Sequence, residues 1–510
     1  MTTAIIKSFL SELLPAVDFN SDFLFAELDS IGIATILYAL SKKYDIVLDS
    51  NDVTPKNFKN IANVTSMVIS KMTLESRIRH YAETTPEKPA AICAGVSKTY
   101  RELWNEILER AEKLSTGGLK PHRAYVFRAN QDIDFIVTYC AVHYLKAVAV
   151  PLECHTSEKI IRMITEELSQ TIFPDGIADT IYTTGTTGKS KGTMLSETYY
   201  VACADNFISD LGFSAELLFI INGPLNHIAS LSKLHPTLTA GGTVYILDGL
   251  KDLNLFFKAF DLPFEKFATF MVPASLKLIM EFSYEKLRSV APKIDFIETG
   301  AAPITGTDME RLSKALPHSR LFNSYGGTEI GCAATYNFND GKYMEGCIGR
   351  PFKNSSVEIS PEGHLIVSGP AIMSGYVNDP EGTAQVIIDG KVHMSDLGYA
   401  DENGLIHLTG RLGDVINVGG FKVNPLEVEN AASSYPGIKD CICIAADHPV
   451  VGTILKLLVV TDGTLDKHLL ASHLKSQLDH YKVPTTYEIV DEIKRTYNGK
   501  IDRKFYRERQ

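Results

Sequence analysis

The sequence predicts a multidomain protein in three parts: an N-terminal four-helix bundle, a large α/β core and a small α+β domain at the C-terminal end. Apolar residues follow a helical spacing in the first part, short apolar strands alternate with helices in the second, and the pattern changes again after the second. The length of 510 residues is enough for about three domains of ~150 residues each. We expect the domains to cover residues 1–72, 76–411 and 412–510.

Residues 1–72 form a self-contained helical segment in this prediction. The apolar residues that share one face of its first helix are Ile5, Ile6, Phe9, Leu10 and Leu13. A second helix begins at the cap-like pair Asp29-Ser30, and its apolar face carries Ile33, Ile36, Leu37 and Leu40. A shorter helical pattern follows in PKNFKNIANVTSMVISKM.

The middle and last parts differ in how their strands and helices alternate. From about Leu74 to Arg411, glycine turns separate short strands and helices, which is typical of an α/β fold with much parallel sheet. The stretches VNPLEVENAASSYPGIKDCICIAAD and KLLVVTDGT then open a smaller α+β segment that ends in a basic tail. The sequence shows neither internal repeats nor a low-complexity linker.

Composition excludes several classes of function. The net charge of −11 argues against a nonspecific partner in nucleic acid or an anionic membrane, because both surfaces would repel the protein. The eight scattered cysteines lack metal-site spacing and indicate reduced thiols in a cytoplasmic protein. The N-terminal MTTAIIKSFLSELLPAV carries a lysine and a glutamate inside its apolar stretch, which favours an amphipathic helix over a signal peptide.

The stretch TTGTTGKSKGT, residues 183–193, is similar to a phosphate-binding P-loop but has Thr183 where the first glycine would stand. Backbone N–H groups and hydroxyls in such a loop can surround a polyphosphate, and its lysines can neutralise charge. The alternative is a solvated surface turn. The candidate phosphate-binding residues are Thr183, Thr184, Gly185, Thr186, Thr187, Gly188, Lys189 and Lys191.

The loop has companions in a fixed order along the chain. They are YTTGTTGKSKG (182–192), ETGAAP (298–303), NSYGGTE (323–329), SDLG (395–398), TGRLGDVINVGGFKVNPLEVE (409–429) and RTYNGKIDR (495–503). This set resembles the core motifs of the adenylate-forming superfamily, which includes acyl- and aryl-CoA synthetases, luciferases and the adenylation domains of peptide synthetases. The resemblance covers roughly residues 76–510, and six ordered motifs make a chance agreement improbable.

The resemblance implies that the protein activates a carboxylic acid with ATP and Mg²⁺, forming an acyl-adenylate and pyrophosphate. It places the β- and γ-phosphates on the Thr183–Lys191 loop, the α-phosphate on Thr328 and the magnesium ion on Glu329. The residues implied for ribose and adenine are Asp396 with Arg411, Tyr325, and the small Gly300, Ala301 and Ala302. As isolated residues, an exposed aspartate, a surface arginine and a packed tyrosine are the alternatives.

The C-terminal motifs imply a catalytic lysine and a hinge. Lys500 occupies the position of a lysine that reaches the carboxylate and the α-phosphate; the alternative is a solvated lysine in a basic tail. Tyr497 stands where the family often has proline. Gly413 occupies the hinge position, usually Asp or Lys in the family, about which the small domain rotates, and its lack of a Cβ favours easy rotation. The alternative hinge is Asp414.

The N-terminal segment resembles an acyl carrier protein. FAELDSIGIATILYALSKKYDI followed by TPKNFKNIANVTSMV places Ser30 where such proteins carry 4′-phosphopantetheine. The alternative is an ordinary helix cap. The resemblance implies a phosphopantetheinyl transferase as a partner, a carrier thiol that is loaded in cis or in trans, and an acyl-transferring enzyme downstream.

The substrate pocket is predicted around PLNHIASLSKLHPTLTAGG, residues 224–242. This stretch resembles the pocket helix of acyl- and aryl-acid activating members, with His227 at the position of their gating residue; a packed core histidine is the alternative. No Asp or Glu lies between Pro224 and Pro236, where amino-acid activating members place an aspartate, so we expect a plain fatty or aryl acid. Two other functions stay open: an acyl-CoA ligase with a vestigial carrier domain, and a noncatalytic carrier or docking module.

Overall fold

The computed structural model describes residues 3–44, 46, 48–183, 191–418, 421–448, 452–461, 463, 465–496 and 500–507. The chain divides into two compact units. The first contains residues 1–180, 195–219 and 231–246, and the second contains residues 181–194, 220–230 and 247–510. Their division passes through the secondary-structure elements β5 (Ile177–Thr183), β6 (Lys191–Ser196), β7 (Leu217–Ile221) and α10 (Ile228–Thr239).

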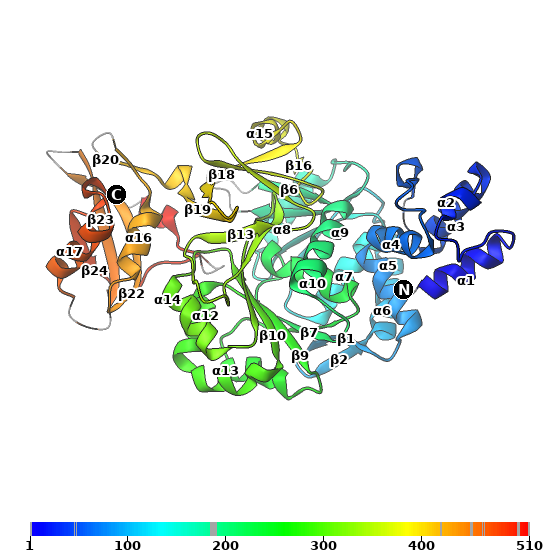
Figure 1. Cartoon of the computed structure of the whole chain (residues 1–510), viewed down its shortest axis with the longest axis horizontal. Helices are drawn as coiled ribbons and strands as arrows, with labels where there is room; N and C mark the ends of the chain where they lie inside the picture. The colour runs from blue at the N-terminus through cyan, green and yellow to red at the C-terminus, as the bar shows by residue number, and fades with distance from the viewer. Residues whose placement is uncertain are drawn as a thin grey trace. The chain divides into compact units, whose positions relative to one another are not determined.

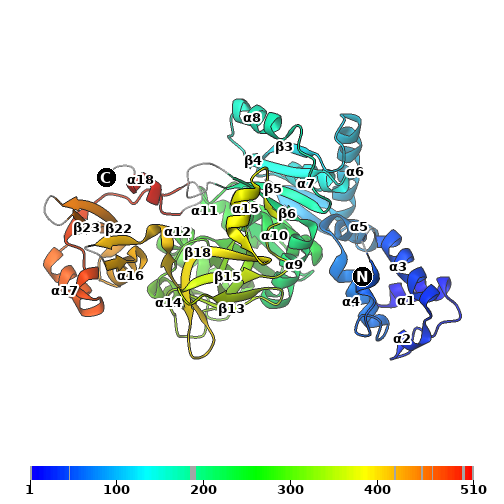
Figure 2. The same ribbon diagram turned by 90° about the horizontal axis from the view of Figure 1, so that it is seen from above.

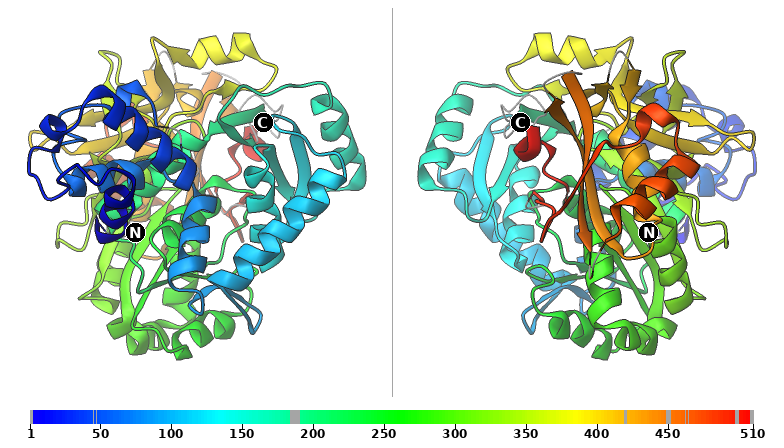
Figure 3. Two further views of the ribbon diagram at one scale, coloured as in Figure 1. Left: turned by 90° about the vertical axis from the view of Figure 1, so that its right-hand side faces the viewer. Right: turned by 90° about the vertical axis from the view of Figure 1, so that its left-hand side faces the viewer.

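The N-terminal segment of the first unit consists of short helices around their own core, drawn in blue in Figures 1 and 3. The helices are α1 (Thr3–Leu13), α2 (Leu24–Glu27), α3 (Ser30–Tyr44), η1 (Ser50–Asp52) and α4 (Ile61–Lys71). Asp29 caps α3, because its Oδ1 accepts a hydrogen bond from the Gly32 N–H at 2.6 Å. The predicted start of this helix is therefore confirmed.

The apolar faces predicted for these helices are correct for α3 and partly wrong for α1. In α3, Ile36 and Leu40 are fully buried, and Ile33 and Leu37 pack against the same core. In α1, Ile6 and Leu10 are buried, whereas Ile5 and Leu13 are about 40% exposed. An α-helix turns by 100° per residue, so a face that buries residues four apart leaves its outermost apolar positions in solvent.

The rest of the first unit follows the predicted α/β pattern. Strands β3, β4 and β5 pair in parallel, β1 pairs in parallel with β8, and β2 pairs with β1 in an antiparallel hairpin. These elements are α5 (Leu74–Thr84), β1 (Pro89–Cys93), β2 (Val96–Thr99), α6 (Tyr100–Thr116), β3 (Ala124–Ala129), α7 (Ile133–Tyr144), β4 (Val148–Glu153), α8 (Glu158–Leu168), α9 (Glu197–Asn206), η2 (Phe207–Leu211) and β8 (Thr243–Ile246).

The second unit begins with three parallel strands and continues as an antiparallel sheet. The order along this sheet is β14-β15-β18-β19-β13-β12-β11-β10-β9. Figure 1 shows α12, α13 and α14 side by side next to β9 and β10. The elements up to the last of the three parallel strands are α11 (Leu253–Lys258), η3 (Ala259–Asp261), β9 (Lys266–Met271), α12 (Pro273–Phe282), α13 (Tyr284–Val290), η4 (Ala291–Lys293), β10 (Ile294–Gly300), α14 (Gly306–Ala315) and β11 (Arg320–Gly327).

After β11 the sheet is antiparallel, whereas the predicted parallel pairing is found in the strands before it. Every sheet pairing from β12 to β19 is antiparallel in the described part of this region. Most strands here follow one another through turns too short for a crossover helix, and a parallel pair needs such a crossover. The elements are β12 (Gly331–Asn337), β13 (Cys347–Pro351), β14 (Ser356–Ile359), β15 (His364–Ser368), β16 (Gly375–Tyr376), α15 (Pro380–Val386), β17 (Ile387–Ile388), β18 (Lys391–Ala400) and β19 (Ile406–Arg411).

The C-terminal segment is the predicted small α+β fold. Strands β22 and β23 form a long antiparallel pair that β24 extends in parallel. Helices α16 and α17 pack together, and α16 packs against β22 (Figures 2 and 3). The elements are η5 (Leu412–Asp414), β20 (Ile416–Val418), β21 (Phe421–Val423), α16 (Pro425–Ser433), β22 (Ile438–His448), β23 (Gly452–Thr461), α17 (Lys467–Gln477), η6 (His480–Lys482), β24 (Thr486–Ile489) and α18 (Arg503–Arg507).

Two further findings concern membrane spans and disulfides. None of the described helices has the length and apolar composition needed to cross a membrane. None of the eight cysteines, all of which lie in the described part of the chain, forms a disulfide.

Candidate active site

Asp396 is the centre of a hydrogen-bonded group in the second unit. Strands β18 and β19 place Asp396 directly opposite Arg411 in antiparallel register. The Arg411 Nε donates to Asp396 Oδ1 at 2.7 Å, and the Tyr325 hydroxyl donates to Asp396 Oδ2 at 2.8 Å. The Arg411 Nη2 also donates to Asp396 Oδ2, at 3.5 Å, so Oδ1 is the oxygen with a free lone pair. The site therefore retains acceptor capacity for a further hydroxyl donor.

Tyr325 packs into the protein core and is almost fully buried. Its residue is 9% exposed and belongs to an apolar core that also contains Ile330 and Ile348. Burial raises the pKa of Tyr325 well above its ordinary value, and the neighbouring Asp396 acts in the same direction. The hydroxyl therefore stays protonated and holds Asp396 in place.

Lys500 lies within electrostatic range of this group. A β-bridge between Arg495 and Ile501 and a 2.7 Å hydrogen bond from the Thr496 N–H to the Lys500 carbonyl close the loop that carries it. Partial loss of water around its ammonium group and the nearby Arg411 cation lower the pKa of Lys500, whereas Asp396 and Glu329 oppose this shift. Lys500 is therefore close enough to Arg411, Asp396 and Glu329 for their charges to act on it, and its catalytic role stays a prediction.

His227 is close enough to Lys500 to feel its charge, and it is neutral. It directly precedes α10, whose first residue is Ile228, and the positive charge of Lys500 acts on its ring. Burial, reinforced by Lys500, lowers the pKa of His227 to about 4. At neutral pH this imidazole can therefore offer one N–H donor and one bare acceptor nitrogen.

Glu329 is half-buried beyond the end of β11, next to the buried Thr328. Its Oε1 accepts a hydrogen bond from the Tyr376 hydroxyl at 3.2 Å. No group of three or more His, Cys, Asp or Glu side chains among the described residues forms a cage for a metal. A single carboxylate fits Mg²⁺ that arrives with a nucleotide, because Mg²⁺ commonly takes one or two protein carboxylates and completes its shell with phosphates and water.

Lys191 interacts with two residues, Asp379 and Tyr376, that the sequence motifs did not predict. Its Nζ lies 2.9 Å from Asp379 Oδ2 and 4.6 Å from the centre of the Tyr376 ring. Tyr376 in turn contacts Glu329, so Lys191 is linked to the predicted magnesium ligand. The stretch SGYVNDPEGT, residues 374–383, contains both missed residues, and its Asn-Asp-Pro turn was the available signal.

The small residues of ETGAAP include one, Gly300, that the close packing of two strands requires, in addition to the predicted role near adenine. A Cβ on Gly300 would lie 2.4 Å from the Ser324 carbonyl oxygen, so glycine is needed where β10 meets β11. Ala301 has a φ of 64°, in the left-handed region that alanine rarely adopts. Such strain often marks functional sites. Ala301 and Ala302 are both partly exposed.

The remaining predicted residues are placed only in part. Thr183 ends β5, and residues 184–190, which include Thr184, Gly185, Thr186, Thr187, Gly188 and Lys189, lie outside the described residues, as does Tyr497. Ser30 is the exposed first residue of α3 in the first unit. Exposure leaves its hydroxyl open to modification.

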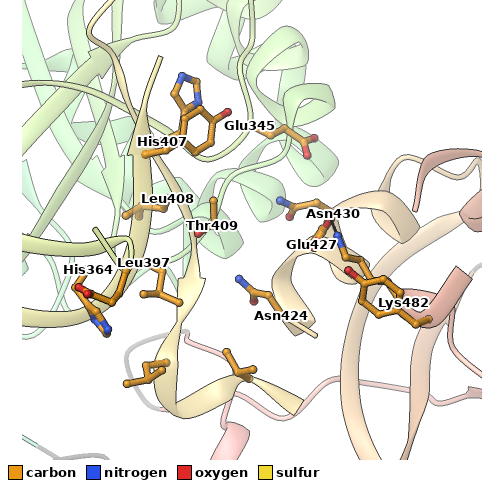
Figure 4. A pocket seen from close by; sticks show the side chains of 15 residues that line it. Glu345, His364, Leu397, His407, Leu408, Thr409, Asn424, Glu427, Asn430 and Lys482 are labelled. Carbon is orange, nitrogen blue, oxygen red and sulfur yellow. Dashed lines mark hydrogen bonds and ion pairs between the residues drawn. The ribbon is translucent and has the colours of Figure 1, made fainter. Parts of the chain in front are cut away.

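A cavity of about 740 Å³ lies beside the predicted hinge in the second unit (Figure 4). Leu412 and Val415, which flank the two hinge candidates, line one part of it. The side chains of Asn424, Asn430 and Glu427 approach from α16 and the residue before it. None of the predicted active-site residues lines this cavity, so it is distinct from the group around Asp396.

Comparison with known proteins places the chain in a family. The sequence matches the AMP-binding enzyme family over residues 78–173 and 166–377, and the AMP-binding enzyme C-terminal domain over residues 427–500. Feruloyl-CoA synthase from Amycolatopsis sp. is 28% identical over 480 residues, which are 82% of this chain and 95% of that protein.

Solved structures show the same fold. ATP-bound MatB from Rhodopseudomonas palustris superposes with a TM-score of 0.78 at 23% identity, covering 86% of this chain and 98% of MatB. The o-succinylbenzoate CoA synthetase MenE from Bacillus subtilis, in complex with ATP and magnesium, gives a TM-score of 0.73 at 22% identity, covering 84% of this chain and 98% of MenE.

The fold and the matched regions define an adenylate-forming ligase with a large α/β core and a small C-terminal domain. The chain belongs to the AMP-binding enzyme family. Neither matched region includes residues 1–77, so the N-terminal helices are an addition to what the family match covers.

Proposed function

We propose that the protein activates a fatty or aryl carboxylic acid as its acyl-adenylate and transfers the acyl group to a thiol carried on Ser30. The observation that supports the first half most strongly is the convergence of Lys500, His227, Glu329 and the Asp396–Arg411 pair in one unit. The names of similar proteins, a feruloyl-CoA synthase and an ATP- and magnesium-bound CoA synthetase, support the same chemistry.

In the first step, a carboxylate oxygen of the acid attacks the α-phosphorus of ATP. The bond from that phosphorus to the bridging oxygen of the β-phosphate breaks, and pyrophosphate leaves. Two anions must approach each other, so the reaction requires concentrated positive charge at the site. Lys500 would supply it between the carboxylate and the α-phosphate, and Thr328 would donate a hydrogen bond to an α-phosphate oxygen.

The other residues would hold ATP in position. Asp396, kept in place by Tyr325 and Arg411, would accept hydrogen bonds from the ribose hydroxyls. Glu329 would ligate Mg²⁺ and the Thr183–Lys191 loop the β- and γ-phosphates, while Gly300, Ala301 and Ala302 would border adenine. Because Lys191 already pairs with Asp379, its role would include orienting Glu329 through Tyr376 as well as neutralising phosphate charge.

His227 would border the acid. Its low pKa keeps it uncharged, which suits a pocket wall that receives an apolar acid and leaves Lys500 as the cation facing the carboxylate. Between Pro224 and Pro236 the chain has no carboxylate to pair with an amino group. We therefore propose a fatty or aryl acid in preference to an amino acid.

The proposed acceptor is a 4′-phosphopantetheine arm on Ser30. Its thiol sulfur would lose a proton and attack the acyl carbonyl carbon, the bond from that carbon to the phosphate oxygen would break, and AMP would leave. Ser30 fits the attachment: it is exposed, it starts α3, and the Asp29 side chain fixes the backbone of this turn without occupying the serine hydroxyl. The second candidate acceptor is free CoA, favoured by the similarity to feruloyl-CoA synthase. Loading in cis and loading in trans are both compatible with the proposal.

ATP–pyrophosphate exchange with a panel of fatty, aryl and amino acids tests the activation step. The proposal predicts exchange that depends on a fatty or aryl acid and on Mg²⁺. Exchange supported only by amino acids would overturn the substrate assignment. No exchange with any acid, in protein shown to be folded by its melting transition, would overturn the catalytic assignment and favour a noncatalytic carrier or docking role.

A further inference from the structure

Arg503 joins two acidic side chains of the second unit, and none of the three residues belongs to the site described above. It is the first residue of α18, and its side chain is 21% exposed. Its Nη2 lies 2.6 Å from Glu429 Oε2 on α16, and its Nε lies 3.5 Å from Asp414 Oδ2 on the turn η5. We name these three residues the Arg503 anchor. One guanidinium therefore connects α18 with α16 and with the turn that carries both hinge candidates.

Glu429 is the buried member of the anchor, with 5% of its surface exposed. Its Oε1 accepts a hydrogen bond from the Cys443 N–H on β22 at 2.8 Å, and its Oε2 accepts one from Arg503. Burial raises the pKa of Glu429, whereas the charge and the hydrogen bond of Arg503 oppose this shift. A buried charge that loses its partner is strongly unfavourable. Glu429 therefore fixes the position of the Arg503 guanidinium.

Arg503 follows Lys500 by three positions, at the end of the loop that carries the lysine. Two backbone hydrogen bonds add to the contacts that close this loop. The Asp502 N–H donates to the Lys494 carbonyl at 2.9 Å, and the Arg503 N–H donates to the Ile501 carbonyl at 3.0 Å. Every residue from Lys500 to Arg503 thus takes part in a backbone contact within the loop, so a displacement of Arg503 would also move Lys500.

The loop has another ion pair at its other end. Arg495 Nη2 lies 2.6 Å from Asp440 Oδ2, and Asp440 lies on β22. This pair holds the loop against the small sheet. The contact of Arg503 with Asp414, by contrast, relates the loop to η5. The anchor therefore gives Lys500 a defined position relative to the hinge turn.

The catalysis proposed for Lys500 requires such a definition. A lysine has a long and flexible side chain, so its ammonium group is only as well placed as its backbone. A misplacement of about 1 Å at a reacting group can cost about 100-fold in rate. Because we expect the C-terminal segment to rotate at η5, a fixed relation between η5 and Lys500 would return the lysine to the same place after each rotation.

We propose that Arg503 and Glu429 position Lys500 for adenylate formation, and that the contact of Arg503 with Asp414 sets the place of the lysine relative to the hinge turn. Both are positioning residues, since they act through Lys500 rather than on ATP or the acid. The inference rests on the proposed catalytic role of Lys500. It gives a function to a buried ion pair that the proposed adenylation steps do not otherwise use.

A double-mutant cycle in the full-length protein tests the anchor. Wild type, Arg503→Gln, Lys500→Ala and the double variant are compared with MgATP and the acid that supports pyrophosphate exchange. The rate of acyl-adenylate formation is measured in single turnover, over times long enough for slow variants. We expect Arg503→Gln to lower the rate about tenfold when Lys500 is present and less than about twofold when it is absent, because residues that act as a unit are not additive.

Lys482→Gln is the matched control. Lys482 forms an ion pair with Glu427, also on α16, at 2.7 Å, so this variant disturbs the same helix without removing a contact to α18. We expect its rate to stay within about twofold of wild type. Arg503→Lys keeps the charge but loses the fork of nitrogens that reaches two carboxylates, so it should recover only part of the lost rate.

The cycle separates positioning from general damage. Equal factors with and without Lys500, a wild-type rate in Arg503→Gln, or the same loss in Lys482→Gln overturns the anchor. Melting transitions show whether each variant is folded; if Arg503→Gln is not, Glu429→Gln takes its place in the cycle, with an expected loss of about threefold because the amide still accepts a hydrogen bond. A wild-type rate in Lys500→Ala overturns the proposed role of the lysine itself, whereas failure of the anchor alone leaves Lys500→Ala slow.

Discussion

At the residue scale, the proposed site depends on Lys500, a cation near the ion pair that Asp396 forms with Arg411. Asp396 and Arg411 neutralise each other at 2.7 Å, whereas Lys500 has a lowered pKa caused by partial desolvation and by the Arg411 charge. A cation that lacks part of its water gains more from an approaching anion than a fully hydrated one does. In the proposed mechanism, Lys500 would therefore gain most from the charge that develops when the acid meets the α-phosphate.

Lys500→Ala should lower acid-dependent pyrophosphate exchange by about 100-fold or more, because removing a preorganised charge removes transition-state stabilisation. MgATP affinity should change only a few-fold. Lys494→Ala is the matched control, since Lys494 is exposed in the same C-terminal stretch and pairs with Glu492. An unchanged exchange rate in Lys500→Ala would remove the lysine from the mechanism.

His143 should make part of the stability depend on pH. Burial works to lower its pKa, but the charge of Asp179 and the hydrogen bonds to Asp179 and Glu75 outweigh it and raise the pKa from 6.5 to about 10 on folding. Its stabilising contribution is therefore complete below about pH 6.5 and disappears as the pH rises through about 10. The titratable groups that contact it or interact with it are Glu75, Asp179, Tyr139 and His235. Tyr200 and Cys140 interact with Asp179. Burial raises the pKa of both tyrosines and of Cys140 well above the ordinary values, so these groups stay neutral over most of that range.

The melting temperatures of the wild type and His143→Gln, measured from pH 6 to pH 10.5, check this. The difference between the two proteins should be largest near pH 6 and should shrink as the pH approaches 10.5. Taking the difference cancels the titration of groups that both proteins share. A difference that stays constant over the whole range would show that His143 is not a buried cation.

At the element scale, the hinge turn η5 contains a glycine that the described conformation does not require. Gly413 lacks a positive φ, and a Cβ built on it meets no atom within 4 Å. Asp414 is held by Arg503, whose Nε lies 3.5 Å from Asp414 Oδ2 and whose Nη2 lies 2.6 Å from Glu429 Oε2. Because Asp414 is held, we expect any rotation between the predicted domains to occur at Gly413, the first of the two hinge candidates, and this stays a prediction.

Gly413→Ala should therefore keep the melting temperature close to wild type, with a change in unfolding free energy within about 0.5 kcal/mol. Gly410→Ala is the contrasting variant: Gly410 has a φ of 151°, and its Cβ would lie 1.8 Å from the Asn424 side chain. It should cost about 2 kcal/mol or more. Thermal unfolding measures both, and equal losses in the two variants would contradict the assigned roles.

The sequence could predict elements whose signal is local. The cap at Asp29 and the apolar face of α3 follow from short motifs. The hydrogen bonds that join His143 to Glu75 and Asp179 could not be predicted, because the three residues lie between positions 75 and 179 and each is an ordinary residue in its own stretch. Only packing brings them together.

The antiparallel second half of the large sheet was missed for a related reason. Alternation of apolar and polar residues identifies strands but not the direction in which a neighbour runs. The link from Lys191 to Asp379 likewise joins stretches almost two hundred positions apart. Long-range pairing of this kind leaves no periodic signal in a single sequence.

At the scale of the whole molecule, the N-terminal helices and the adenylate-forming region raise one question: whether the acyl group is transferred to this chain itself. The segment has its own apolar core, and an exposed serine starts its longest helix. Because acid activation is proposed in the second unit and the acceptor in the first, Ser30→Ala should separate the two half-reactions. Pyrophosphate exchange should stay within about twofold of wild type, since no activation residue changes.

Intact-mass spectrometry of the full-length protein tests the central claim most directly. Wild type and Ser30→Ala are treated with a phosphopantetheinyl transferase and CoA, freed of CoA, and then incubated with MgATP and the acid that supports exchange. The account predicts that wild type gains the mass of the arm and then that of the acyl group, whereas Ser30→Ala gains neither and still catalyses exchange. Acyl mass on Ser30→Ala, or rapid turnover of wild type on free CoA without any acyl mass on the protein, would contradict it.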